Sequence, residues 1–205
     1  MSEPKRPLIV GLTGSIGMGK TETAKMFASL GIPIFDADAA VHRLYETGGE
    51  AVPQIAKLWP DCVRDGRVDR SVLAAQVTAG VISLKTLEAI VGPFVARQQQ
   101  AFIDNACARG AEMVVLDIPL LFEAGGHRRV DAVVVVSAPA PVQRERVLAR
   151  PGMTPEKLDQ ILERQMPDAE KRAKAHFVVE TGKGLEQALE QVKAIVAELQ
   201  ERSRS

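Results

Sequence analysis

The sequence predicts an α/β fold in which a parallel sheet is flanked by helices. The first observation is a set of short runs that are apolar throughout, as strands covered by helices on both faces require. The second is that segments with apolar residues every three or four positions lie between these runs. The five runs are Leu8–Leu12, Ile32–Phe35, Met113–Leu116, Ala132–Val136 and Phe177–Val179.

A glycine-rich loop follows the first run. Its residues are, in order, Gly14, Ser15, Ile16, Gly17, Met18, Gly19, Lys20 and Thr21. They fit the pattern G-x-x-x-x-G-K-[ST] between a strand and a helix, in which glycines let backbone N–H groups face phosphate oxygens. The pattern predicts a phosphate-binding loop (P-loop) for a nucleoside triphosphate. A glycine-rich turn without a ligand is the alternative.

Four residues are candidates for nucleotide chemistry, three in or beside this loop and one at the end of another apolar run. The ammonium of Lys20 is expected to reach the β- and γ-phosphates, and the hydroxyl of Thr21 to bind Mg²⁺. Asp117 ends the third apolar run, a position typical of the Walker-B carboxylate that faces the P-loop and its magnesium ion. We include Glu22, the residue after Thr21, among the nucleotide-binding positions.

Two carboxylates, Asp36 and Asp38, follow the second apolar run. Ligands of open α/β sheets bind at the carboxyl ends of the parallel strands. A carboxylate there can orient an acceptor hydroxyl and accept its proton. The alternative is that one or both residues cap a helix that begins near Ala39.

The stretch from about Ala37 to Gly110 is too long for a simple crossover and contains no convincing strand, so we predict a helical insertion. Asp65-Gly66 is typical of a turn between elements. Asp69 is placed to cap a helix over Arg70–Thr78.

A longer helix is expected within this insertion after Ser83, which is placed as its N-cap. Pro93 lies inside that helix. Because proline removes a backbone donor and crowds the preceding turn, we expect the helix to bend or break near Gly92.

The segment from Pro139 to Pro155 is interrupted by Pro151-Gly152 and carries several arginines, so we predict a lid. Arg146 and Arg150 are four residues apart, a spacing that puts them on one face of a helix, where they could clamp a transferring phosphate. A solvated surface pair is the alternative. A further helix is expected to start at Thr154-Pro155.

The last segment of the chain has the clearest helical period. Its apolar stripe consists of Leu185, Leu189, Val192, Ile195, Val196 and Leu199. Charged residues fall on the other faces, so we expect this helix to pack its stripe on the sheet and close the fold.

Composition restricts the class of function. The 205 residues include 26 basic and 26 acidic ones without a basic run, so a small anionic ligand fits better than nucleic acid. No apolar stretch is long enough for a membrane span, and the short polar start is unlike a signal peptide. We expect a cytoplasmic protein, monomeric or weakly homo-oligomeric, with no nucleic-acid or membrane partner.

Further motifs accompany the P-loop in a specific order. They are Asp36-Ala37-Asp38, Asp65-Gly66-Arg67-Val68-Asp69-Arg70, Leu116-Asp117-Ile118-Pro119-Leu120-Leu121-Phe122-Glu123 and Gln143-x-x-Arg146. With these motifs the chain resembles the dephospho-CoA kinase family from about Leu8 to Val196. The P-loop belongs to a whole superfamily, whereas the Asp-Ala-Asp and Pro-Leu-Leu-Phe-Glu strings are much narrower signatures.

The resemblance implies transfer of the γ-phosphoryl group of ATP to the ribose 3′-hydroxyl of dephospho-coenzyme A, the last step of coenzyme A synthesis, with Mg²⁺ required. It implies a P-loop nucleoside triphosphate hydrolase fold of the nucleotide-kinase type. The core would comprise residues 1–36, 109–139 and 168–205. The helical acceptor-binding domain would span 37–108, and the lid 140–167.

The resemblance also implies roles for single residues. Asp38 would be the general base, Lys20 and the loop amides would hold phosphate, and Arg146 and Arg150 would close on it. Thr21 and Asp117 would be the magnesium ligands. The positions that match the acceptor site are Asp38, Arg43, Arg70, Leu120 and Glu123.

Three residues depart from the usual pattern of that family. Gly92 precedes Pro93 where a histidine is usual, His176 replaces an aspartate, and Met18 replaces a small loop residue, often serine. None of them is the loop lysine, the magnesium hydroxyl or the expected base. We therefore expect activity to survive, with acceptor affinity most open to change.

Two other functions share part of these features. Another nucleoside or nucleoside-monophosphate kinase would have the same phosphate chemistry and a different acceptor pocket. A GTP-dependent switch would act without a small-molecule acceptor, but the [NT]-K-x-D string typical of guanine recognition does not occur in the sequence.

Overall fold

The computed structural model of the chain describes residues 6–204. It divides into two compact units. One consists of the described chain up to Phe35 together with the part from Ala106 onward, and the other runs from Asp36 to Asn105. No helix in the described range is long and apolar enough to cross a membrane.

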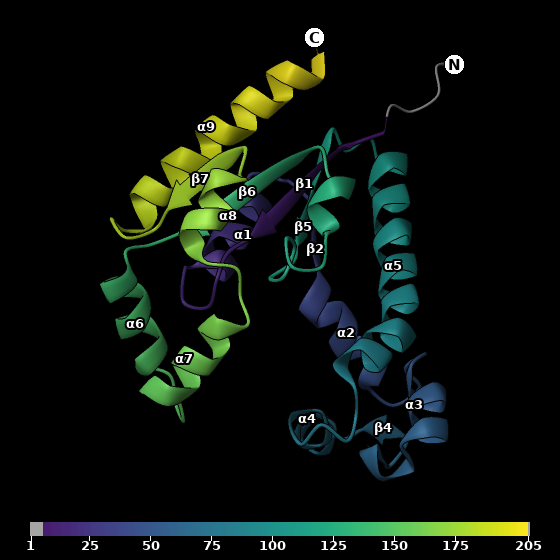
Figure 1. Cartoon of the computed structure of the whole chain (residues 1–205). Helices are drawn as coiled ribbons and strands as arrows, with labels where there is room; N and C mark the ends of the chain where they lie inside the picture. The colour runs from purple at the N-terminus through teal and green to yellow at the C-terminus, as the bar shows by residue number, and fades with distance from the viewer. Residues whose placement is uncertain (1–5, 205) are drawn as a thin grey trace. The chain divides into compact units, whose positions relative to one another are not determined.

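A five-stranded sheet forms the centre of the first unit (Figure 1). Its strands are β1 (Leu8–Thr13), β2 (Ile34–Asp36), β5 (Met113–Asp117), β6 (Ala132–Ser137) and β7 (Phe177–Glu180), in the spatial order β2-β5-β1-β6-β7. β1 pairs in parallel with β5 and β6, and β6 pairs in parallel with β7. The predicted α/β class and the five predicted strands are confirmed.

Each strand ends one residue later than its apolar run. The additional residues are Thr13, Asp36, Asp117, Ser137 and Glu180, all of them polar. The side chain of each takes part in a hydrogen bond. The predicted strands are one residue too short because they were defined by their apolar residues, whereas the observed strands are defined by backbone pairing.

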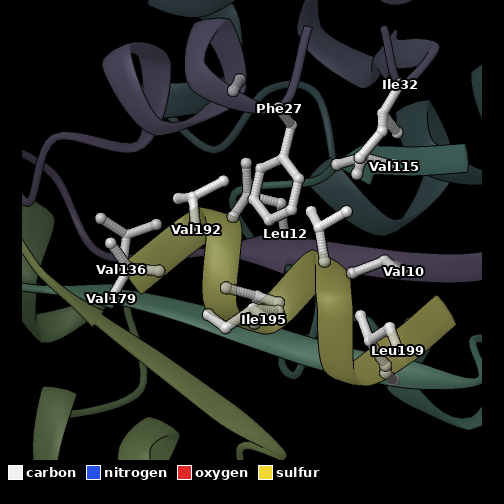
Figure 2. Packing of buried hydrophobic residues seen from close by; sticks show 14 of the residues in the cluster. Val10, Leu12, Phe27, Ile32, Val115, Val136, Val179, Val192, Ile195 and Leu199 are labelled. Carbon is white, nitrogen blue, oxygen red and sulfur yellow. The ribbon is translucent and has the colours of Figure 1, made fainter. Parts of the chain in front are cut away.

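Helices α1 (Lys20–Ser29) and α9 (Leu185–Arg204) cover one face of the sheet. Figure 2 shows apolar side chains of α9, among them Val192 and Ile195, gathered with Phe27 of α1 and residues of β1 in one buried cluster. The predicted packing of the last helix is therefore confirmed. Leu185 is an exception, because the first residue of the helix is exposed.

The opposite face carries a smaller apolar cluster. Leu121 and Phe122, from the segment after β5, pack there with Val133 and Val135 of β6. Because side chains alternate along a strand, these valines face away from the larger core. Two short helices lie next to these segments in the sequence. They are η2 (Gly126–Arg129), between β5 and β6, and α8 (Asp168–Ala173), just before β7.

Two helices occupy the segment predicted as a lid. They are α6 (Ala140–Leu148) and α7 (Pro155–Glu163). The side chain of Thr154 caps α7 by accepting the N–H of Lys157, so the predicted start of this helix is confirmed.

The second unit is mainly helical. Its elements are α2 (Ala37–Tyr45), α3 (Val52–Leu58), η1 (Pro60–Cys62), β3 (Val63–Arg64), β4 (Arg67–Val68), α4 (Arg70–Thr78) and α5 (Leu84–Ala108), the last of which runs on past the unit boundary. Leu44, Ile55 and Leu73 belong to its buried core. Asp69 caps α4 as predicted, because its side chain accepts the first N–H groups of that helix.

The expectation that the insertion contains no strand is wrong at one place. β3 and β4 form an antiparallel hairpin in which Val63 lies opposite Val68. The turn residues Asp65 and Gly66 have φ values of 51° and 73°, as a tight two-residue hairpin turn requires. Strands this short are too brief to show an alternating pattern, although the turn itself was predicted.

Of the two outcomes expected at Pro93, a bend or a break, the break does not occur, since α5 runs without interruption from Leu84 to Ala108. A proline crowds the N–H and the Cβ of the residue before it. Here that residue is Gly92, which has no Cβ. Part of the usual steric cost of proline inside a helix is therefore absent.

Candidate active site

The P-loop connects β1 to α1, as predicted, and its backbone uses conformations that glycine adopts most readily. Gly17 and Gly19 have φ values of 76° and 95°. A side chain at either position would be strained. Gly19 is also the N-cap of α1, so no capping side chain covers the first N–H groups of the helix. Such uncovered N–H groups are suited to bind an anion.

Lys20 and Asp117 meet at the end of this loop. The ammonium of Lys20, in the first turn of α1, donates a hydrogen bond to Oδ1 of Asp117 at the tip of β5. Their side chains are 17% and 7% exposed, so the two charges interact where water screens them poorly. The predicted position of Asp117, facing the P-loop, is confirmed.

The residues expected to hold Mg²⁺ supply oxygen atoms. Thr21 follows Lys20 in the first turn of α1 and is exposed, and Asp117 provides a carboxylate. Mg²⁺ in kinases commonly takes one or two protein oxygens and completes its shell with phosphate and water. Within residues 6–204, no cluster of three or more His, Cys, Asp or Glu could hold a metal ion. The hydroxyl of Thr21 and the carboxylate of Asp117 are oxygen donors that fit a magnesium ion bound together with a nucleotide.

Glu22 lies on the exposed surface of α1 beside the P-loop. Its carboxylate pairs with the ammonium of Lys25 at 2.7 Å, three residues further along the helix. An exposed pair of this kind contributes little to stability.

Arg146 contacts the P-loop and the segment after β7. Its guanidinium donates to Oγ1 and O of Thr181, at 2.9 and 2.8 Å, and to the carbonyl oxygen of Gly17 at 3.5 Å. The hydroxyl of Thr181 in turn donates to the carbonyl oxygen of Met18 at 2.6 Å. Sequence reasoning missed Thr181. Its place directly after a strand of the sheet was the signal that could have indicated it.

Arg150 lies outside the helix that carries Arg146. Because α6 ends at Leu148, the prediction that the two arginines share one helix face is wrong. The residue before a proline is pushed away from the helical conformation, and Pro151 follows Arg150. Arg150 is exposed, and the described part of the chain offers its guanidinium no hydrogen-bond or ion-pair partner.

Glu123 anchors the segment that follows β5. Its Oε1 accepts the N–H of Met166 at 2.8 Å and lies 2.9 Å from the ammonium of Lys171. That ammonium also donates to the carbonyl oxygen of Pro119 at 3.4 Å. Burial alone would raise the pKa of Glu123, but the hydrogen bonds outweigh it and hold the pKa below its ordinary value. Leu120, in the same segment, is exposed.

The second unit holds Asp36 and Asp38, which have different structural roles. Asp36 is the N-cap of α2, because its Oδ1 accepts the N–H of Ala39 at 2.9 Å. The capping interpretation of Asp36 is therefore confirmed. Asp38 lies within the first turn of α2 with an exposed side chain, where the helix dipole favours a carboxylate.

Two arginines expected at the acceptor site belong to the same unit. Arg43 is in the last turn of α2, Arg70 is the first residue of α4, and both are exposed. Burial raises the pKa of Tyr45, and the positive charge of Arg70 partly opposes this shift.

Comparison with known proteins identifies this arrangement. The family model described as dephospho-CoA kinase matches residues 8–187. The chain belongs to the dephospho-CoA kinase family. A dephospho-CoA kinase from Rhodopseudomonas palustris (strain HaA2) is 55% identical over 189 residues, which are 92% of this chain and 94% of the relative. The activity is accordingly that of a dephospho-CoA kinase, the ATP-using final step of coenzyme A biosynthesis.

Solved structures support the same fold. The crystal structure of a Thermus thermophilus protein is 38% identical to this kinase, with a TM-score of 0.84 over 95% of this chain and 99% of that one. The dephospho-CoA kinase from Campylobacter jejuni is 19% identical and has a TM-score of 0.64 over 94% of this chain and 97% of its own. The latter likeness concerns the fold alone.

Two departures from the family pattern have structural explanations in this kinase. Nδ1 of His176 accepts the backbone N–H of Val133 at 3.0 Å, a bond that a carboxylate can also accept. Met18 is buried, and its Sδ accepts the N–H of Ala138 at 3.1 Å. The imidazole thus keeps an acceptor at its position, and the thioether ties the P-loop to the end of β6.

Proposed function

We propose that this kinase transfers the γ-phosphoryl group of ATP to the ribose 3′-hydroxyl of dephospho-coenzyme A at its P-loop, with Mg²⁺ held by Thr21 and Asp117. The observation that carries the proposal is the hydrogen bond between Lys20 and Asp117. It joins the cation expected on the β- and γ-phosphates to the carboxylate expected beside the magnesium ion.

The P-loop would bind the nucleotide through its backbone N–H groups and Lys20. The nucleotide-binding positions are Gly14, Ser15, Ile16, Gly17, Met18, Gly19, Lys20, Thr21 and Glu22. Phosphoryl transfer has a loose transition state, so positioning and charge stabilisation supply most of the acceleration. Contact with Asp117 orients the ammonium of Lys20 before substrate binds. When bound, Mg²⁺ offsets negative charge on the phosphoryl oxygens.

Asp38 is the general base in this proposal. It would accept the proton of the ribose hydroxyl as that oxygen attacks the γ-phosphorus. The carboxylate of Asp36 is already engaged as a helix cap, whereas that of Asp38 is exposed in the same first turn.

Arg150 and Arg146 contribute to transfer by different routes. Arg150 has an exposed guanidinium that can close on the transferring phosphate. Arg146 is bonded to Thr181 and to Gly17, so its charge acts next to the P-loop backbone.

The acceptor would be held by the residues that match the acceptor positions of the family. Arg43 and Arg70 are exposed cations suited to the phosphates of dephospho-coenzyme A. Leu120 offers an exposed apolar contact. Glu123 supports the segment that carries Leu120, because its carboxylate is bonded to Lys171 and to the backbone.

The enzyme is proposed to work in the cytoplasm as a monomer or a weak homo-oligomer, without nucleic-acid or membrane partners. Balanced charge, with 26 basic and 26 acidic residues, supports the absence of a nucleic-acid partner. Light scattering of the purified protein across a range of concentrations measures the oligomeric state directly.

Acceptor specificity tests the proposal. Purified protein is given ATP and Mg²⁺ with dephospho-coenzyme A, adenosine, AMP or shikimate, and ADP release is followed by a coupled assay. We expect release above background only with dephospho-coenzyme A, and loss of release when EDTA removes Mg²⁺. Phosphate on any other ribose hydroxyl, read from the product by NMR, would contradict the 3′ assignment.

A further inference from the structure

Two glutamine side chains bind the two peptide groups on either side of one P-loop residue, Ile16, one as a donor and the other as an acceptor. Nε2 of Gln143 donates to the carbonyl oxygen of Ile16 at 2.8 Å. The N–H of Ile16 donates to Oε1 of Gln165 at 3.1 Å. Both backbone polar groups of Ile16 are therefore bonded to side chains from distant parts of the sequence.

The two glutamines lie near the two ends of the segment predicted as a lid, residues 140–167. Gln143 belongs to α6, and Gln165 follows the end of α7. Gln143 is only 7% exposed, so its amide would be costly to leave without a partner. The two ends of one arginine-bearing segment are thus attached to the same residue of the loop.

We propose that Gln143 and Gln165 are positioning residues that hold the P-loop in its phosphate-binding conformation and tie both ends of the lid segment to it. This inference rests on the proposed use of the loop for ATP. Ile16 directly precedes Gly17, whose φ of 76° is part of the loop conformation. A rotation of the peptide group between Ile16 and Gly17 would therefore redirect the N–H of Gly17, which belongs to the loop.

Isosteric glutamate substitutions test the polarity of the two bonds, because an ionised glutamate accepts hydrogen bonds and donates none. Gln165→Glu keeps the acceptor for the N–H of Ile16. Gln143→Glu removes the donor for the carbonyl oxygen of Ile16 and sets a carboxylate against it. Gln160→Glu adds the same charge at an exposed position of α7 and is the matched control.

We expect Gln143→Glu to raise KM for ATP about tenfold, the scale of one lost hydrogen bond together with repulsion. Gln165→Glu should stay within about threefold of the Gln160→Glu control. KM for dephospho-coenzyme A should change less than KM for ATP in each variant, a split that a general loss of stability would not produce. If Gln143→Glu does not fold, Gln143→Met removes the donor without adding charge, and a KM for ATP that then rises severalfold supports the proposal.

Equal KM values for ATP in the folded variants at positions 143, 165 and 160 would overturn the inference. So would equal increases at 143 and 165, because they would reflect added charge and not bond polarity. Failure of the proposed function would be distinguishable from failure of this inference, because the wild-type protein itself would then not phosphorylate dephospho-coenzyme A.

Discussion

The ammonium of Lys171, whose side chain has no solvent exposure, lies 2.9 Å from Oε1 of Glu123. The side chain of Glu123 is 19% exposed, and its carboxylate also accepts the N–H of Met166. Removal of one partner from a buried pair leaves an uncompensated charge, whose cost depends on its access to water. The cation has no such access and the anion has some. The two halves of the pair should therefore respond differently to substitution.

Glu123→Gln leaves the charge of Lys171 buried beside a neutral group, so we expect it to lower the free energy of unfolding by about 3–5 kcal/mol. Lys171→Met removes the buried charge and keeps an unbranched apolar chain. It should cost less than Glu123→Gln, because the remaining carboxylate is partly hydrated and still bonded to Met166. Urea unfolding of both variants checks the order, and the reverse order would contradict this account.

Acidification should weaken the same interaction. Burial raises the pKa of Glu123, but hydrogen bonds from Met166 and Lys171 outweigh it, so in the folded protein this pKa lies below its ordinary value of 4.5. The stabilisation is complete above that ordinary value and is lost as the pH falls through the folded pKa, since the unfolded chain binds the proton first. Urea titrations at a series of acidic pH values should show a shallower loss of stability for Glu123→Gln. The same slope as in the wild type would count against the assignment.

Lys20→Ala should lower kcat on the order of a hundredfold or more, the scale for loss of one donor that stabilises transition-state charge. Asp117 is 7% exposed and loses its cation, so some stability should be lost as well. Steady-state rates are therefore compared on protein shown to be folded by circular dichroism. Lys25→Ala removes an exposed lysine of the same helix and should leave kcat unchanged. Near-wild-type turnover in folded Lys20→Ala would defeat the assignment of this loop.

Arg146 and Arg150 should respond differently to substitution. Arg150→Ala should lower kcat with little change in melting temperature, because the side chain is exposed and contacts made late in the reaction raise kcat more than they lower KM. Arg146→Ala should lower both kcat and melting temperature, since it loses its bonds to Thr181 and Gly17. Unchanged kcat in both single variants and in the double variant would mean that neither arginine takes part in phosphoryl transfer.

Asp38→Asn keeps size and hydrogen-bonding shape but removes the charge that would accept the hydroxyl proton. General-base assistance is typically worth about 10²–10⁴ in rate, and a loose transition state puts the expected fall in kcat near the lower end. KM for ATP should hardly change.

Asp36→Ala is the matched control for Asp38→Asn. It loses the cap of α2, so unfolding should cost about 0.5–2 kcal/mol less, with a smaller effect on kcat than at Asp38. A kcat for Asp38→Asn within about twofold of wild type, far below the general-base range, would remove Asp38 from the catalytic set. A larger loss of kcat at Asp36 would move the base there.

The sheet and the P-loop could be predicted because local sequence determines them. A short run of buried residues such as Ala132–Val136 has few alternatives to a covered parallel strand. The loop pattern requires glycine at Gly19, whose φ of 95° other residues rarely adopt. The meeting of Lys20 with Asp117 then follows from where a strand ends and a helix begins.

Long-range partners could not be predicted in the same way. Nothing near Glu123 in the sequence indicates that it pairs with Lys171, and nothing near Arg146 indicates Thr181. Both contacts depend on how the chain returns to the sheet after α7. The effect of a proline on a helix also depended on its surroundings. Pro93 is accommodated inside α5, whereas α6 ends before Pro151 and leaves Arg150 outside it.

The polar residues at the ends of the five strands determine where the fold can tolerate insertions and deletions. In each strand a buried apolar residue is followed at once by a polar one, as Leu12 is by Thr13 and Val136 by Ser137. Deleting one residue within a strand would shift its pairing, turn its side chains to the opposite faces and move its polar tip off the edge where it is bonded. Deletions and insertions should therefore be tolerated in the exposed connections and excluded from the strands, while substitutions at the tips alter chemistry and leave the sheet in place.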